Sequence, residues 1–144
     1  MNILDIAIIV FVIMEAANVI ILYFFSDSRL GNGVAVFNTW FNAKNQKDME
    51  LFAKYMTNWV AGTKLIFIVL LLVILLTAEN NTKFFAVLAM VLSIATYYFR
   101  LNSIIKKLDV MGEITPMGYS KTLWWMITGF IVLFSSSAIL YVLI

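Results

Sequence analysis

Cysteine and histidine are both missing from this 144-residue chain, and proline occurs once. Without cysteine there is no disulfide bond and no thiolate-bound iron–sulfur cluster. Without histidine as well, zinc sites built from the usual ligands and histidine-ligated haem are excluded. The commonest general base of enzymes is also absent. We therefore expect no cofactor and no metal, and an enzyme is the least favoured class of function.

Charge is scarce too: charged residues make up 12% of the chain and hydrophobic residues 63%. Soluble proteins average about 25% charged and roughly 45–50% apolar residues, so this composition indicates an integral membrane protein. The net charge of +2 is too small to indicate a nucleic-acid partner. No basic region precedes the first apolar run, and Glu15 interrupts that run, so we expect it to be retained as a transmembrane helix.

Four apolar runs are long enough to cross a bilayer, at about residues 3–25, 58–78, 84–105 and 122–144. At ~1.5 Å rise per residue, a helix of about 20 residues spans the hydrocarbon core of ~30 Å. The sequence therefore predicts an all-α integral membrane protein. We expect one domain over residues 1–144, a four-transmembrane-helix bundle.

The first loop contains a short amphipathic segment at residues 34–43. Phe37, Trp40 and Phe41 recur there at helical spacing, with asparagines on the other side. The segment is too short to span, so the pattern predicts an interfacial helix with these aromatics in lipid. The alternative is a loop packed on the bundle. Further aromatic anchors are expected at the membrane–water interfaces; they are Trp59, Trp124 and Trp125.

Basic residues are concentrated on one side of the predicted membrane. Loop one (residues 26–57) contains four and loop three (residues 101–121) contains three, whereas loop two (residues 79–83) has Lys83 alone. Because basic loops stay in the cytoplasm, we expect loops one and three to be cytoplasmic and both termini outside.

Glu15 lies near the middle of the first run, where an ionisable group costs at least about 2.5 kcal/mol on insertion scales. It therefore needs a partner or a function. In the predicted orientation, Asn18, Lys64, Arg100 and Thr128 lie in one layer just inward of it. These five residues are the candidate ion- or substrate-binding residues. The economical arrangement has Glu15 facing Lys64 or Arg100 inside the bundle, where opposite charges offset the cost of insertion.

Three helical stripes are expected to face the interior, because their spacing of three and four residues places each on one helix face. They are Ile8, Phe11, Glu15, Asn18 and Leu22 in the first span, Ala86, Ala89, Ser93, Thr96 and Arg100 in the third, and Trp125, Thr128, Val132 and Ser135 in the fourth. The stripe of the third span is small or polar throughout, which is typical of close helix packing in membranes.

Three hypotheses about function follow. The first is transport or permeation of an ion or small solute, with Glu15 as the gate or coupling site of an oligomer. The second is a non-catalytic accessory or assembly subunit of a larger membrane complex. The third is a lipid-modifying membrane enzyme in which Lys64 and Arg100 hold a phosphate. In every case the lipid bilayer is an expected partner. We also expect either further copies of the chain, forming a homo-oligomer, or other subunits of a membrane complex.

The position of Glu15 resembles that of a glutamate in the small multidrug-resistance transporters, which place one near the middle of the first of four short helices. The resemblance covers this single residue. The present chain is longer and has a first loop of roughly 30 residues with an amphipathic segment. The likeness is an analogy of fold and implies no membership of that family.

Overall fold

The computed structural model describes residues 2–29 and 34–144. Over these residues the secondary structure is helical, with an isolated β-bridge and no strand. The segments long and apolar enough to cross a membrane are four: α1 (Ile3–Phe24), α3 (Lys47–Thr77), the run Asn80–Val110, and α6 (Tyr119–Leu143). The all-α architecture with four candidate spans is therefore confirmed. Residues 30–33 of the predicted first loop lie outside the described part of the chain.

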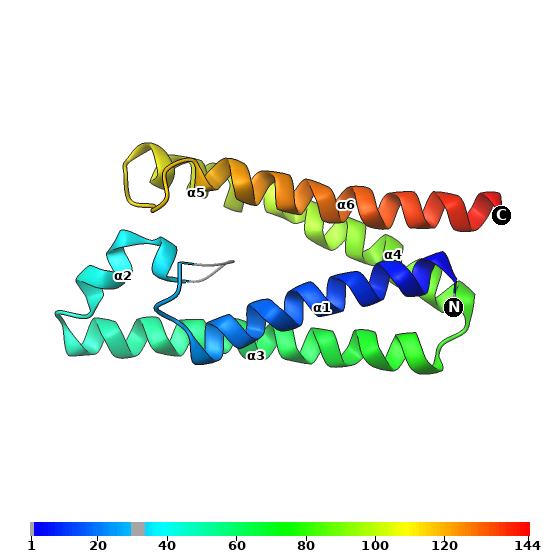
Figure 1. The fold of residues 1–144 in the computed structure, drawn as a ribbon, viewed down its shortest axis with the longest axis horizontal. Helices are drawn as coiled ribbons and strands as arrows, with labels where there is room; N and C mark the ends of the chain where they lie inside the picture. Colours follow the sequence, from blue (N-terminus) through cyan, green and yellow to red (C-terminus); the bar gives the residue numbers. More distant parts are fainter. Residues whose placement is uncertain (1, 30–33) are drawn as a thin grey trace.

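The helices run lengthwise beside one another, and the two ends of the molecule differ in structure (Figure 1). Both termini and the short α3–α4 turn lie at one end. The other end contains η1 (Val34–Val36), α2 (Asn38–Ala43), α5 (Leu101–Val110) and the loop that leads into α6. Loops one and three therefore lie together, opposite the termini. Which end faces the cytoplasm stays a prediction.

α1 is the central helix of the bundle, since it packs against α3, α4 and α6. In its most apolar window 39% of the residues are buried, against 17–22% in the other three candidate spans. Phe11 lies at the centre of this packing: its ring contacts Phe67 of α3 and Phe130 and Phe134 of α6, with centroids 5.0 to 6.1 Å apart. The stripe predicted for the first span is confirmed, with Glu15 half-buried and the others buried; these are Ile8, Phe11, Asn18 and Leu22.

The interior stripe predicted for the third span is wrong. α4 (Asn80–Ala95) buries Lys83, Val87 and Met90. The predicted stripe is exposed at Ala89, Ser93, Thr96 and Arg100. Small residues allow close helix approach, but here α4 meets the core through large apolar side chains that fill the space beside α1. The small-residue face is thereby turned outward.

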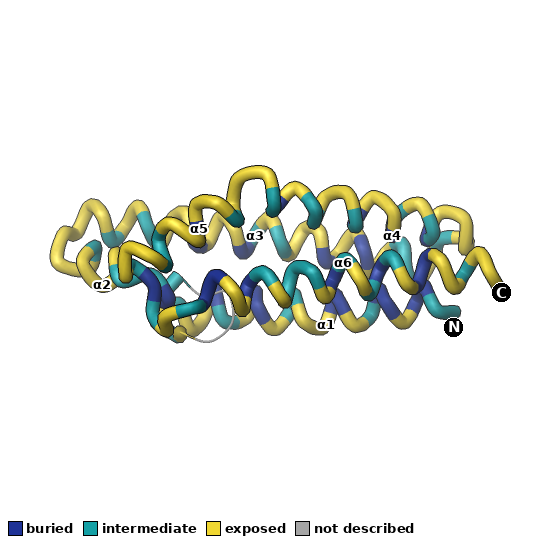
Figure 2. Tube along the Cα trace, turned by 90° about the horizontal axis from the view of Figure 1, so that it is seen from above, coloured by how far each residue is buried: buried dark blue, intermediate teal, exposed yellow. Residues whose placement is uncertain are grey.

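The stripe predicted for the fourth span is also wrong. α6 contributes Phe130, Phe134 and Ala138 to the core. Trp125 and Val132 are exposed instead, while Thr128 and Ser135 are half-buried. The phenylalanines occupy the interior because their rings fill the space around Phe11, and the helix rotates to bury them. Figure 2 shows the buried positions gathered on the inward sides of the helices.

The third span is interrupted rather than continuous. α4 ends at Ala95, the 3₁₀ turn η2 (Thr96–Tyr98) follows, and α5 begins at Leu101. The Thr96 hydroxyl donates a 2.6 Å hydrogen bond to the Ser93 carbonyl, a local bond of the kind that bends helices. Arg100 lies in the break with φ −131° and ψ −52°, outside helical geometry. The backbone at Arg100 therefore departs from the path of the uninterrupted helix that the sequence predicts for the third span.

Residues 34–43 are fastened to residues 112–115 of loop three, and we call this pair of segments the clasp. The backbone N–H of Asn38 donates to the Glu113 carbonyl (2.9 Å), and that of Thr115 donates to the Val36 carbonyl (2.8 Å). The Asn38 side chain adds two more bonds, donating to the Gly112 carbonyl (2.8 Å) and accepting from the Thr115 hydroxyl (3.0 Å). The clasp therefore joins loops one and three.

The placement predicted for Trp40 is wrong, because this side chain is only 3% exposed and cannot lie in lipid. Its indole N–H donates to Asp27 Oδ1 at 2.8 Å, and Lys44 pairs with the same carboxylate oxygen at 2.8 Å. Phe41 is 38% exposed and Phe37 is half-buried. The helix predicted over residues 34–43 is present in part, as the 3₁₀ turn η1 followed by α2, and it packs on the protein through Trp40.

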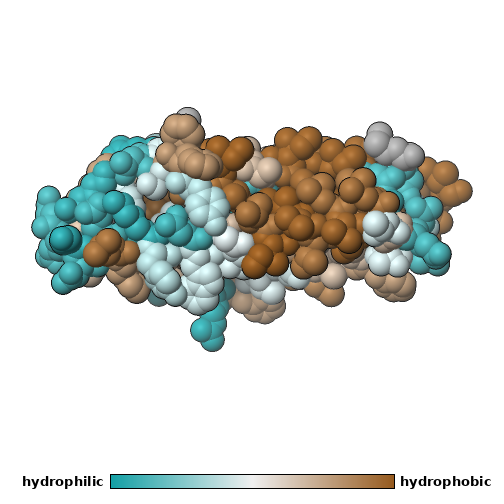
Figure 3. Space-filling view, turned by 90° about the horizontal axis from the view of Figure 1, so that it is seen from below, coloured by the Kyte–Doolittle hydropathy of each residue, from teal (hydrophilic) through white to brown (hydrophobic). Residues whose placement is uncertain are grey.

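Large apolar side chains cover much of the molecular surface. On the face seen in Figure 3, an apolar region over the middle of the bundle lies between two more polar ends. α3 illustrates the pattern, since Ile66, Val69, Leu70 and Val73 are each at least half exposed. Such a surface matches a lipid environment, in which the hydrocarbon takes the place of a protein core.

Candidate functional site

The site begins with an ion pair between α1 and α3. Lys64 Nζ lies 2.6 Å from Glu15 Oε2, and their side chains are 26% and 16% exposed. The two helices are neighbours over much of their length, which brings the only charged residues of their central segments together. This confirms the prediction that Glu15 faces Lys64 or Arg100, with Lys64 as the partner.

Asn18 lies one helical turn after Glu15 and is 9% exposed. Its Oδ1 atom is buried and accepts no hydrogen bond within the described part of the chain. Glu15 and Asn18 both line a cavity of about 220 Å³ between α1 and α6, closed on the α6 side by Met126 and Phe130. The cavity therefore has one acidic and one amide residue in walls that are otherwise apolar.

A larger groove borders the Lys64 side chain. It has a volume of about 490 Å³, runs between α2 and α3, and includes Trp40, Met56 and Lys64 in its walls. Lys64 thus borders this groove while its partner Glu15 borders the smaller cavity. Each member of the Glu15–Lys64 pair therefore borders a different space.

Two predicted site residues are not brought to this pair. Arg100 is exposed in the break between η2 and α5, and no ion pair of the described residues includes it. Thr128 donates to the Trp124 carbonyl (2.7 Å), and its hydroxyl also lies 2.6 Å from that of Tyr98. The predicted polar layer therefore shrinks to Glu15, Lys64 and Asn18.

A second ion pair between two candidate spans was missed by the sequence analysis. Lys83 Nζ of α4 lies 2.8 Å from Asp5 Oδ1 of α1, and both side chains are nearly buried, at 11% and 12% exposed. Asp5 also forms a capping box with Asn2, whose side chain donates to Asn80 Oδ1 at 2.7 Å. Both residues lie near the ends of predicted spans on the same predicted side. Matching opposite charges at equal depth would have found the pair.

The two pairs differ in what surrounds them. Asp5 is closed in by its cap, by Lys83 and by the helix end, and it lines none of the cavities described here. Glu15 lies ten residues further along α1, about 15 Å away, and lines a cavity. Chemistry involving a mobile ligand is therefore expected at Glu15 and not at Asp5.

The remaining predicted anchors lie on the outside of the bundle or near it. Trp59 and Trp125 are 59% and 68% exposed. Trp124 is half-buried, and its ring meets Trp125 edge to face with centroids 4.8 Å apart. These positions fit the expected aromatic belt, and contact with a membrane interface stays a prediction.

No protein-family model, curated protein or solved structure matches the chain.

Proposed function

We propose that the protein moves a cation or a proton across the membrane, with Glu15 as the coupling carboxylate and Lys64 as its internal counter-charge. The observation that carries the proposal is the shared cavity of Glu15 and Asn18, because it combines a negative charge with an unpaired acceptor. A cation or a proton-carrying group satisfies both acceptors. An anion does not, because the carboxylate repels it.

Lys64 gives the empty site a low-energy resting state. Leaving a carboxylate unpaired at this depth costs several kcal/mol, and the lysine removes that cost. A cation that enters the cavity competes with the ammonium group for Glu15, so binding becomes an exchange of partners. Once released, Lys64 is free to turn toward the groove that it also borders. The ion pair then acts as a gate between the two spaces.

The predicted orientation in the membrane indicates where the path opens on the inner side. The groove is built by α2 and α3 at the end that contains loops one and three, which the basic residues assign to the cytoplasm. The cavity of Glu15 lies further from that end along α1. We therefore place the inner opening of the path at the groove beside Trp40. A second copy of the chain would complete the path, because a single four-helix bundle this thin leaves its helices widely exposed.

A second candidate function is favoured by the two ion pairs between the helices. Asp5 and Glu15 each find a lysine within the same molecule, which suits a passive structural role. Such a protein would be an accessory subunit, and its exposed helix faces would contact other subunits. In that role Glu15 holds α1 and α3 in register and binds no ligand.

Flux measurements on reconstituted protein separate the two functions. Liposomes containing a pH-sensitive dye are given an outward proton gradient, and Na⁺, K⁺ or an organic cation is added outside. We expect cation-dependent proton movement with the parent chain and none with Glu15→Gln. Asp5→Asn is the matched control, because it alters the other ion pair and leaves the Glu15 cavity intact. Equal flux through the parent and Glu15→Gln, or no flux above empty liposomes, overturns the transport proposal.

A further inference from the structure

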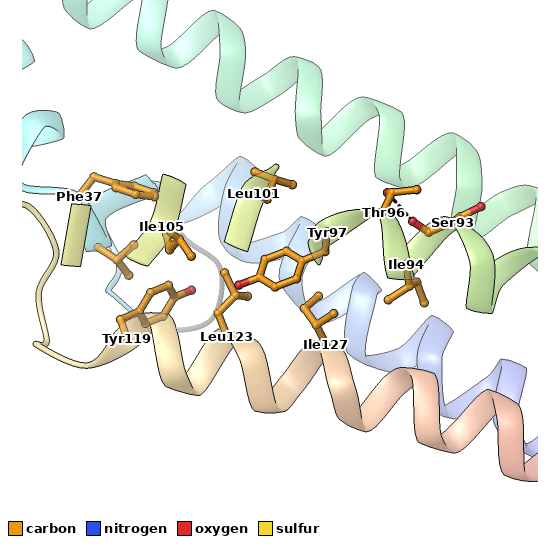
Figure 4. Close-up of a pocket in the computed structure, with 11 residues that line it drawn as sticks. Phe37, Ser93, Ile94, Thr96, Tyr97, Leu101, Ile105, Tyr119, Leu123 and Ile127 are labelled. Carbon is orange, nitrogen blue, oxygen red and sulfur yellow. Dashed lines mark hydrogen bonds between the residues drawn. The ribbon is translucent and has the colours of Figure 1, made fainter. Parts of the chain in front are cut away.

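The break in the third span creates a cavity that is separate from the Glu15 site. Its volume is about 360 Å³, its walls come from η1, α4, η2, α5 and α6, and none of its lining residues borders the Glu15 cavity. The walls are mainly aliphatic, with Ile94, Ile105, Leu123 and Ile127 among them. Figure 4 shows these side chains converging on the space beside the interrupted helix.

One polar group in this cavity lacks a partner. Tyr97 is 6% exposed, and its hydroxyl is buried and makes no hydrogen bond within the described part of the chain. In Figure 4 the Tyr97 ring extends across the cavity toward Leu123 of α6. Buried hydroxyls normally find a partner, since an unmade hydrogen bond is costly in an apolar site. The geometry therefore points to a ligand that supplies an acceptor to the phenol.

The depth of Tyr97 limits what that ligand can be. Tyr97 contacts the ring of Tyr98 (centroids 5.3 Å apart), which contacts Trp124 (6.4 Å). Trp124 and Trp125 are the predicted belt of α6, and such belts lie at the level of the lipid headgroups and the acyl linkage. The rim of the cavity is exposed at Ser93 and Thr96 on the outer side of α4 and η2, so it opens to the lipid side of the bundle.

We propose that this cavity binds an acyl lipid, with the hydrocarbon chain along the aliphatic walls and the acyl carbonyl accepting a hydrogen bond from the Tyr97 hydroxyl. The six aliphatic residues of the walls suit a hydrocarbon chain, and the hydroxyl groups lie on the remaining walls, at Ser93, Thr96, Tyr97 and Tyr119. The α6 wall runs from Tyr119 to Ile127, eight helical steps or about 12 Å, which is long enough for part of an acyl chain. The site shares no lining residue with the Glu15 cavity, while Phe37 borders both this site and the groove beside Trp40. Its test does not depend on transport.

Photo-crosslinking in vesicles tests the site. The probes are a phosphatidylcholine and a free fatty acid that carry the same diazirine on the acyl chain, and an alkane with the diazirine but no carbonyl. After irradiation, the modified residues are mapped by mass spectrometry. We expect the carbonyl probes to label the cavity residues more strongly than they label the exposed faces of α3. Preference for the phosphatidylcholine identifies a bilayer lipid as the source, and preference for the fatty acid identifies a free acid.

Tyr97→Phe removes the hydroxyl and should lower cavity labelling by the carbonyl probes about fivefold, the effect of one ordinary hydrogen bond, with no change for the alkane. The variant should fold normally, because the hydroxyl that it lacks has no hydrogen-bond partner among the described residues. Tyr98→Phe is the matched control, since its hydroxyl contacts Thr128 outside the cavity. Ile127→Phe narrows the cavity and should reduce labelling by all three probes.

Three results would overturn the proposal. The first is labelling spread evenly over the exposed helices, with no excess at the cavity. The second is equal labelling of the parent and Tyr97→Phe by the carbonyl probes. The third is an alkane that labels the cavity as strongly as the carbonyl probes in the parent chain, since the phenol would then make no contribution.

Discussion

Lys64 Nζ lies 2.6 Å from Glu15 Oε2, and each of the two residues borders a different cavity. The contact joins α1 to α3 across 49 residues of chain. Among the ion pairs of the described residues, both members border one of the larger cavities only in this pair. This relationship connects the stability of the bundle to the proposed movement of a cation, and it can be tested through stability alone.

Lys64→Met is expected to destabilise the bundle by about 3 kcal/mol, near the lower end of the range for breaking a buried pair, because both side chains are partly exposed. The loss arises mainly from the uncompensated Glu15 charge. Adding Glu15→Gln to the same chain should therefore recover most of it. The free energy of unfolding, measured by denaturant titration in detergent micelles, provides the comparison.

The control for this prediction is Lys54→Met. Lys54 pairs with Glu50 on the surface of α3, where the side chains are 50% and 30% exposed, so we expect a much smaller loss of stability than in Lys64→Met. A Lys64→Met protein as stable as the parent would show that the Glu15 charge is solvated, and no gate could then depend on its burial.

The sequence predicts the spans and the Glu15 partner for the same physical reason. Apolar runs must lie in lipid whatever the packing, and a charge inside one of them needs an opposite charge at a similar depth. Lys64 meets that condition. Arg100 also meets it on a straight helix, but η2 rotates the chain before Arg100 is reached. No glycine or proline lies between Ser93 and Arg100 to signal this break.

The orientation of side chains around each helix was harder to predict. Small residues and large residues both occur on α4, and only the shape of the neighbouring surface decides which face is buried. Phe11 on α1 creates a core that favours Val87 and Met90 over Ala89 and Ser93. Trp40 poses a similar problem, because an aromatic stripe looks the same against lipid or protein. The partner that decides its position, Asp27, lies 13 residues earlier in the chain.

The predicted orientation in the membrane can be tested with single cysteines, because the chain contains none of its own. Cysteines at Lys47 and Lys107 should react with a membrane-impermeant maleimide only from the cytoplasmic side, and one at Asn81 only from outside. All three positions are exposed. Labelling is measured in intact cells and in inverted vesicles. Reaction of position 81 from the cytoplasmic side would reverse the proposed path.

The clasp should depend on Asn38, whose side chain both donates to Gly112 and accepts from Thr115. Asn38→Ala removes these bonds, and we expect a loss of about 1–3 kcal/mol, confined to the clasp. Hydrogen exchange at residues 34–43 and 112–115 should accelerate, while the core of α1 keeps its protection. Asn42→Ala is the control, since this exposed side chain takes no part in the clasp bonds. Unchanged exchange in Asn38→Ala would mean that the backbone bonds alone hold the clasp.

At acid pH, protonation of Asp27 should weaken its hydrogen bond with the Trp40 indole and release the Trp40 side chain. Hydrogen bonds from Lys44 and from the Trp40 indole hold the pKa of the Asp27 carboxyl below its ordinary value of 3.8. A lowered pKa means that the folded clasp favours the carboxylate. Its contribution to stability is therefore fully present above pH 3.8 and is lost as the pH falls through the lower pKa of the folded protein. We expect a change in Trp40 fluorescence centred below pH 3.8, followed in a chain with Trp59, Trp124 and Trp125 replaced by phenylalanine.

Asp27→Asn isolates this effect from the other carboxylates that titrate in acid. The amide cannot ionise, so Trp40 fluorescence in this variant should lose the transition while the rest of the protein responds to pH as before. Because the Asp27 side chain is 62% exposed, added salt should also weaken the contact with Lys44 and reduce the amplitude of the transition in the parent. A transition that is the same in Asp27→Asn, or that is centred above the ordinary aspartate pKa, would assign the release of Trp40 to another group.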